Sequence, residues 1–191
     1  MNPSAFTTTQ ILIALAIVAV VVGAILVFLL QKRRTQRLNT KFGESEYSRA
    51  VTERGGGRRE AEAELDRRSE RVQSFHLRPL SSPDRARFVS TWTKVQAHFI
   101  DGPASAVTEA DQLLADVMTT RGYPVSDFEQ RAADISVDHP QVTVNYRAAH
   151  AIALRQISGK ATTEDLRQAL IHYRALFEDM VGEPKEMALT A

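Results

Sequence analysis

The stretch ILIALAIVAVVVGAILVFLLQKRR, residues 11–34, decides how the rest of the chain is organised. Residues 11–30 carry no charged side chain. At about 1.5 Å per residue, a helix of this length spans about 30 Å, the thickness of the hydrocarbon core of a bilayer. A helix also satisfies its backbone hydrogen bonds internally, which lipid requires. The stretch therefore predicts a single transmembrane helix, preceded by a short extracytoplasmic segment of residues 1–10.

A cleaved signal peptide is the alternative for an apolar segment near an N-terminus. Such a peptide begins with a basic region, has a shorter apolar run and ends at small residues. Residues 1–10 carry no side-chain charge, and the apolar run is followed by Gln31 and three basic residues. The sequence therefore favours a permanent anchor.

Positive charge on one side of the anchor predicts its orientation. Five basic residues follow the apolar run before any acidic one: Lys32, Arg33, Arg34, Arg37 and Lys41. Because basic residues flank membrane helices on the cytoplasmic side, residues 31–191 are expected in the cytoplasm and the N-terminus outside. The same side chains would attract anionic lipid headgroups at about 1 kcal/mol each, although a stop-transfer signal explains them as well.

The remaining composition limits the classes of function. Residues 42–75 contain seven basic and eight acidic residues, and residues 76–191 contain twelve basic and fifteen acidic ones. The folded part is therefore mildly acidic, which argues against nucleic acid as a partner. The chain has no cysteine, which excludes disulfides, clusters bound by thiolates and cysteine nucleophiles.

Residues 31–75 are expected to form a basic collar, a glycine hinge and a charged stalk helix. The helix is expected to break at Gly43, and the three glycines at 55–57 form the hinge before a helix over 58–75. The apolar positions of that helix are Ala61, Leu65, Val72 and Phe75. Because Arg68 interrupts this row, the pattern predicts an exposed stalk helix, with a short coiled coil as the alternative.

Two helices offer a route to a homo-oligomer. The spacing of Ala19 and Gly23 would let two transmembrane helices approach closely, and the stalk helix would pair as a coiled coil. Alanine and glycine are common in transmembrane helices in any case, so the oligomeric state stays open.

Residues 76–181 are expected to fold as a small helical bundle. Apolar residues recur every three or four positions in four segments. These are Phe88, Trp92, Val95 and Phe99; Val107, Ala110, Leu114, Val117 and Met118; Val142, Tyr146, Ala149, Ala153 and Ile157; and Leu166, Leu170, Tyr173, Phe177 and Met180. No segment alternates as a strand does, so the sequence predicts an all-α fold with a flexible tail at 182–191.

Helix-capping residues separate these segments. Ser82 before Pro83 and Asp138 before Pro140 are expected to begin helices. Thr162 and Asp165 resemble a capping box with Asp in place of Glu.

Motifs that carry enzyme chemistry are absent from the sequence. There is no phosphate-binding loop, no G-x-S-x-G, no H-E-x-x-H and no Glu-x-x-His pair on the bundle helices. We therefore expect no catalytic residue, metal or cofactor. The alternative is a metal site at Asp138, His139 and His150, which would need the preceding loop to fold back.

The segment RGYPVSDFEQRAADISVDHP, residues 121–140, is the candidate binding surface. It is the least periodic part of the bundle and the richest in functional groups. Together with one residue beyond it, the candidates are Tyr123, Phe128, Glu129, Arg131, Asp134, Asp138, His139 and His150. If this is a binding surface, Glu129, Arg131 and His139 should be exposed and close together, beside Tyr123 or Phe128.

A structural role for the same segment is the open alternative. Tyr123 and Phe128 would then pack into the core. Asp127 and Asp138 would cap helices. Arg131 would form an ion pair with Asp134.

Several segments resemble a family of small bacterial single-pass membrane proteins with a cytoplasmic helical domain. These segments are RGYP (121–124), DFEQRAAD (127–134), SVDHP (136–140), YRAAH (146–150) and DLRQA (165–169). The resemblance covers roughly residues 35–181. It implies a bacterial origin and a plasma-membrane location, and it brings no activity with it.

Three functions follow from these patterns. The first is a membrane-anchored, non-enzymatic interaction or scaffold module with an unidentified protein partner. The second is a membrane-tethered enzyme or metal-dependent hydrolase that uses the acidic residues and histidines of 127–150. The third is a structural protein that acts at the lipid surface through its basic collar.

Overall fold

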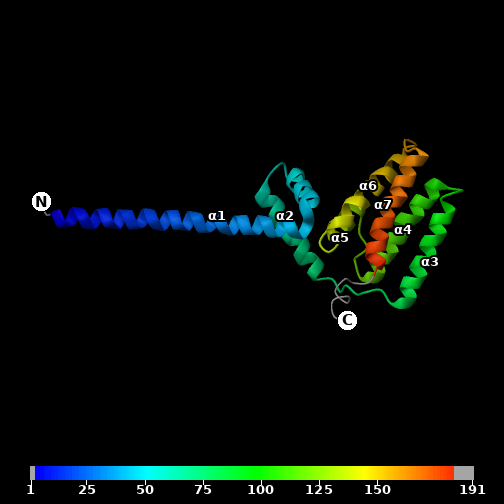
Figure 1. The fold of residues 1–191 in the computed structure, drawn as a ribbon, viewed down its shortest axis with the longest axis horizontal. Helices are drawn as coiled ribbons and strands as arrows, with labels where there is room; N and C mark the ends of the chain where they lie inside the picture. The colour runs from blue at the N-terminus through cyan, green and yellow to red at the C-terminus, as the bar shows by residue number, and fades with distance from the viewer. Residues whose placement is uncertain (1–2, 183–191) are drawn as a thin grey trace. The chain divides into compact units, whose positions relative to one another are not determined.

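The structure, a computed structural model, describes residues 3–182, and these form α-helices without a strand. In chain order the helices are α1 (Pro3–Glu53), α2 (Arg58–Gln73), α3 (Ser82–His98), α4 (Pro103–Arg121), α5 (Phe128–Ile135), α6 (Pro140–Ile157) and α7 (Thr163–Val181) (Figure 1). The all-α prediction is confirmed. Apart from Gly182, the predicted tail lies outside the described residues. The chain divides into two compact units, one ending at Thr40 and the other beginning at Lys41.

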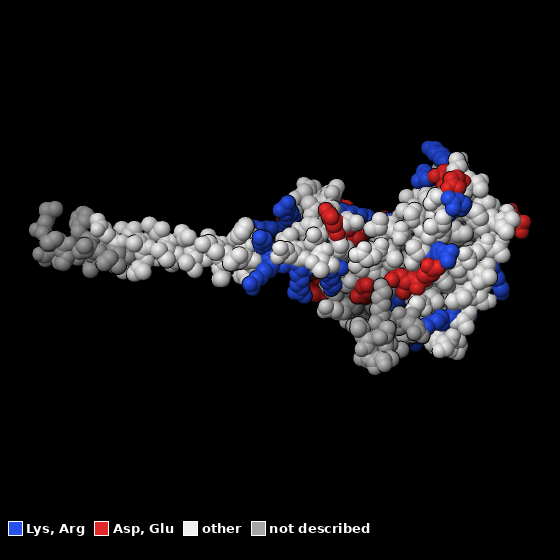
Figure 2. Space-filling model, in the orientation of Figure 1, with Lys and Arg blue, Asp and Glu red and all other residues white. Residues whose placement is uncertain are grey.

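The N-terminal unit is the first part of α1. This helix is long and apolar enough to cross a membrane, and its apolar stretch is not buried by protein. Figure 2 shows the uncharged part of α1 ending where Lys and Arg side chains begin, and Lys32, Arg33, Arg34 and Arg37 are exposed on it. Some signal sequences share this length and apolar composition.

The expected break in α1 occurs at Gly43, where φ is 72° and ψ is 162°. This left-handed conformation is open to glycine and interrupts the helical backbone. Around and after this break, the end of α1 forms an antiparallel pair with α2, here called the α1–α2 hairpin (residues 41–73). Its polar contacts run along both helices: Lys41 Nζ donates to Ser69 Oγ at 2.9 Å, and Tyr47 Oη donates to Glu62 Oε1 at 3.1 Å.

The second helix of this hairpin is not an exposed stalk. Ala61, Leu65 and Val72 are buried, and Phe42 and Ala50 are buried on α1. The apolar residues of α2 are covered because this helix folds back along the end of α1 and also packs against α5.

The bundle is made of α3, α4, α7 and α6, packed side by side in that order (Figure 1). Each contributes the apolar face expected from its spacing, and Trp92 stacks on Phe177 with ring centroids 4.8 Å apart. One residue of the predicted core is wrong: Ile157 is 83% exposed because α6 ends there, and Ile152 is buried one turn earlier.

The helix caps agree with the sequence in most places. Thr162 and Asp165 form the capping box, and Asp127 accepts from the Gln130 backbone N–H at the start of α5. Helix α3 is capped by Ser81, one residue before the predicted Ser82. The prediction for Asp138 is wrong, because His139 occupies the N-cap position of α6 without a side-chain cap.

Candidate functional site

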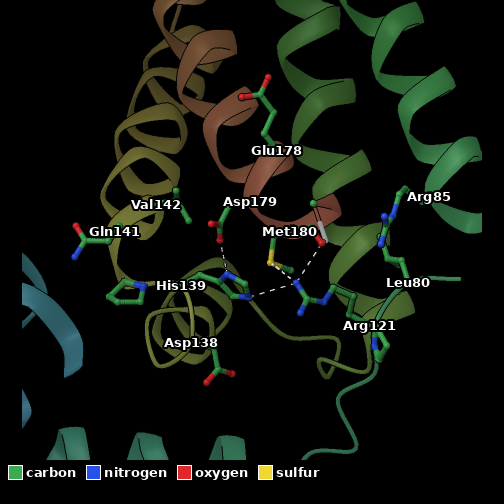
Figure 3. A pocket seen from close by; sticks show the side chains of 13 residues that line it. Leu80, Arg85, Arg121, Asp138, His139, Gln141, Val142, Glu178, Asp179 and Met180 are labelled. Carbon is green, nitrogen blue, oxygen red and sulfur yellow. Dashed lines mark hydrogen bonds and ion pairs between the residues drawn. The ribbon is translucent and has the colours of Figure 1, made fainter. Parts of the chain in front are cut away.

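A cavity of about 440 Å³ lies at one end of the bundle, where α4 and α7 end and α6 begins (Figure 3). This region is built by three chain turns that meet there. Apolar lining comes from Pro79, Leu80, Pro140, Val142 and Met180, and polar lining from Arg85, Arg121, Asp138, His139, Gln141, Glu178 and Asp179. Volume and mixed lining are those of a small-ligand or side-chain pocket.

A hydrogen-bonded row crosses this cavity. His139 Nδ1 contacts Asp179, and Arg121 Nη1 lies 3.3 Å from His139 Nε2 (Figure 3). Because a guanidinium only donates, Nε2 must accept, which leaves the proton on Nδ1 to be donated to the carboxylate of Asp179. Both ring nitrogens of His139 are therefore engaged.

Arg121 is positioned by the end of α4. Gly122 follows it with a φ of 100°, the left-handed residue that closes the helix. The turn lets Arg121 reach α7, where Nη1 also donates to the carbonyl oxygen of Met180 at 3.2 Å. Arg121 therefore binds the last turn of α7 and His139 at the same time.

Tyr123 follows this glycine and contacts Asp138, one of the residues that line the cavity. It is 4% exposed, packs edge-on against Phe75, and its Oη donates to Asp138 Oδ2 at 3.3 Å. Burial, together with the charge of Asp138, raises the pKa of Tyr123 above its ordinary value. The hydroxyl therefore stays a hydrogen-bond donor, which positions the Asp138 carboxylate.

The charged groups of the cavity are separated. Figure 3 shows Arg85 and Arg121 on one side, and Asp138 and Asp179 toward the other. A ligand with an acceptor or anionic group at one end and a donor or cationic group at the other would match this arrangement.

The predicted binding residues do not form one site. Asp138 and His139 line the cavity, and Tyr123 donates a hydrogen bond to Asp138 from outside the lining. Phe128, Arg131 and His150 pack inward from α5 and α6, and Glu129 and Asp134 pair with the α1–α2 hairpin. The structure thus does not bring Glu129, Arg131 and His139 together as expected for one surface.

The inward group is an aromatic stack. The rings of Phe128 and His150 lie 3.5 Å apart at 7°, and Phe128 also contacts Tyr146 at 4.8 Å. Burial lowers the pKa of His150, with a smaller contribution from Arg131, against the opposing charges of Asp111 and Glu129. Phe128 therefore has the structural role that the alternative interpretation gave it.

The third group is an ionic clasp between the hairpin and the bundle, formed by Glu46, Arg49, Arg68, Arg71, Glu129, Asp134 and Arg147. Arg147 donates to Glu46 at 3.0 Å and to Glu129 at 2.8 Å. Asp134 pairs with Arg71 at 3.2 Å and accepts from Gln130 at 2.7 Å. The predicted pairing of Asp134 with Arg131 is therefore wrong.

Several of these residues were missed by sequence reasoning. Arg121 begins the quoted segment, but nothing in its spacing indicated His139 as a neighbour. Asp179 and Glu46 lie in regular helices, and their partners are 40 and 101 residues away. No local pattern reports such contacts.

Metal binding at Asp138, His139 and His150 finds no support in the geometry. Among the described residues, no three histidine, aspartate or glutamate side chains are placed to hold an ion. His150 is stacked on Phe128, and the nitrogens of His139 are already engaged.

No protein-family model, curated protein or solved structure matches this chain. The resemblance to bacterial single-pass membrane proteins thus stays an expectation from the sequence.

Proposed function

We propose that this chain is a single-pass protein of a bacterial plasma membrane whose cytoplasmic helical bundle acts as a non-enzymatic interaction or scaffold module. Its N-terminus lies outside, the basic collar adjoins the inner lipid surface, and residues 41–181 present a binding site to a protein partner. The proposal joins the anchor and its flanking charge to the cavity at the end of the bundle.

One observation supports binding over catalysis. A general base needs a nitrogen free to accept a proton from a substrate. In the cavity, Nδ1 of His139 contacts Asp179 and Nε2 accepts from Arg121, so the ring is held as a fixed part of the wall. The separated charges around it favour recognition of a partner's polar and apolar side chains.

An enzyme remains the second candidate because Asp179 and His139 form a carboxylate–imidazole pair that lines a cavity. Such a pair would serve as a base if Arg121 moved away from Nε2. Hydrolytic activity abolished by His139→Gln would favour this candidate over the first.

Affinity capture of the intact protein from membranes tests the proposal. The test variant, Asp138→Asn with Gln141→Ala, changes exposed side chains that line the cavity. Its matched control, Asp116→Asn with Gln112→Ala, changes an exposed pair on α4 that bond each other at 3.3 Å.

We expect captured partners to be lost from the test variant and retained by the control, with similar melting temperatures for both. Retention of the same partners by both variants would contradict the cavity as the binding site.

A further inference from the structure

Ion pairs connect the α1–α2 hairpin to the bundle. Arg147 of α6 binds Glu46 of α1, which is 2% exposed, and Arg49 of α1 binds Glu129 of α5 at 3.0 Å. Helix α2 adds Arg71, paired with Asp134 of α5. Charged side chains from α1, α2, α5 and α6 therefore meet at one interface.

Within the clasp, acidic and basic groups share partners. Glu129 accepts from both Arg49 and Arg147 and remains 67% exposed. Arg68 lies 3.9 Å from Glu46 and 3.8 Å from Glu53, with a closer contact of 3.3 Å to Glu64. An open groove of about 460 Å³ is lined by Arg49, Glu53, Glu64, Arg68, Glu129 and Arg147, so solvent ions reach the pairs among these groups from one side. The side chains of Glu46 and Asp134 are 2% exposed and lie outside this lining.

The apolar interior of the hairpin is separate from that of the bundle. Among the described residues, the contiguous bundle core begins at Leu80 and includes none of the buried apolar residues of the hairpin. Ala133 on α5 and Val137 in the turn after it are buried outside this core.

Physical chemistry gives such an interface a definite behaviour. Ion pairs reached by solvent weaken as salt shortens the screening length to about 3 Å at 1 M. Apolar cores do not weaken in this way, because salts that are excluded from protein surfaces strengthen burial. Added salt should therefore separate the hairpin from the bundle before either part unfolds.

We infer that the α1–α2 hairpin is a releasable cover of α5 and α6, and that the ionic clasp is the switch that holds it closed. Closed, the hairpin keeps Asp134 at 1% exposure and covers Ala133. Open, it frees this face and lengthens the connection between the membrane anchor and the bundle. This inference concerns a face distinct from the cavity and does not depend on the proposed function.

Asp134 is a carboxyl buried at this interface. Desolvation raises the pKa of this carboxyl, against the opposing effect of Gln130 and Arg71. Release of the hairpin would return Asp134 to water and remove that cost.

Distance measurements between spin labels on the full chain in lipid nanodiscs test this inference. The chain has no cysteine, so labels attach only where they are introduced. Ser48→Cys on α1 with Ala151→Cys on α6 spans the clasp, and Ser90→Cys with Ala151→Cys lies within the bundle; all three positions are exposed.

We expect one short distance across the clasp in 50 mM NaCl and an additional longer one in 1 M NaCl. Glu46→Gln with Glu129→Gln should show the longer distance already in low salt. Glu164→Gln removes an exposed pair with Arg167 outside the clasp and should behave as the parent chain. The distance within the bundle should not change in any of these cases.

An unchanged clasp distance at both salt concentrations in the parent chain would overturn the inference, whatever the variants do. It would also be overturned if both label pairs broadened together, because the hairpin and bundle would then separate only by unfolding.

Discussion

His150 makes the stability of the bundle depend on pH. Burial against Phe128 lowers its pKa below the ordinary 6.5, so the folded state favours the neutral ring. Below pH 6.5 the unfolded chain binds a proton more readily than the folded chain, and stability falls as pH decreases. Melting temperature should therefore drop between pH 7.5 and pH 5.5.

His150→Gln isolates the contribution of this ring. The variant should lose part of the decrease in melting temperature over the same pH range, because Gln does not titrate. If the melting temperatures of the parent chain and the variant decrease equally, other groups account for the pH dependence. The His150 ring would then not contribute to it.

Phe177 is the residue whose truncation should destabilise the bundle most clearly. It is 4% exposed and stacked on Trp92. Phe177→Ala leaves a cavity and should lower the free energy of unfolding by about 3–5 kcal/mol. Urea denaturation measures this, and Val125→Ala, at a site 86% exposed, should change it by less than about 0.5 kcal/mol.

At the scale of elements, the turn after α4 depends on a glycine that no other residue can replace easily. Gly122 has a φ of 100°, and a Cβ added there would lie 2.5 Å from the carbonyl oxygen of His76. Gly122→Ala therefore combines a left-handed backbone, at about 1–2 kcal/mol, with a collision against the backbone.

Gly159→Ala is the matched control for this turn. Gly159 also has a positive φ, of 67°, but no described atom lies within 4 Å of the added Cβ. Thermal unfolding should show a clearly larger loss for Gly122→Ala than for Gly159→Ala. Equal losses would mean that only the backbone conformation matters and that His76 moves aside.

The helices of the bundle were predictable because their burial is periodic in the sequence. Helix α7 shows this best: the spacing of Leu166, Tyr173 and Phe177 places them on one face, and all are buried. The burial of α2 was not predictable. Its charge indicated a solvated helix, and a charged residue such as Arg68 does not reveal whether its partners lie in water or on another helix.

The candidate site was predictable only in part. Tyr123, Asp138 and His139 do line or support a cavity because they flank turns that meet at one end of the bundle. Glu129 does not, because it lies on α5 and pairs there with Arg49 of the hairpin and Arg147 of α6. Side-chain direction on an eight-residue helix follows from its neighbours, which the sequence does not locate.

For the whole molecule, membrane topology is the prediction most open to test. Basic residues after the apolar part of α1 predict that the bundle lies in the cytoplasm. In a chain without native cysteine, Ser90→Cys on α3 should react with a membrane-impermeant maleimide only after the cells are broken. Gel mobility of the labelled protein measures the reaction.

Ser4→Cys, near the N-terminal end of α1, provides the complementary control. It should react in intact cells, because the N-terminus is expected outside. Labelling of position 90 in intact cells would reverse the orientation, and the absence of position 4 from the mature protein would identify the apolar segment as a cleaved signal.

The sequence separation of Glu46 and Arg147 has a consequence for biosynthesis. Arg147 is added 101 residues after Glu46. At about 5–20 residues per second, that interval on the ribosome is roughly 5–20 s. The apolar segment is translated still earlier, so it can enter the bilayer while the second half of the contact does not yet exist. Each newly made copy therefore begins with its hairpin apart from the bundle and closes this contact only after Arg147 has been made.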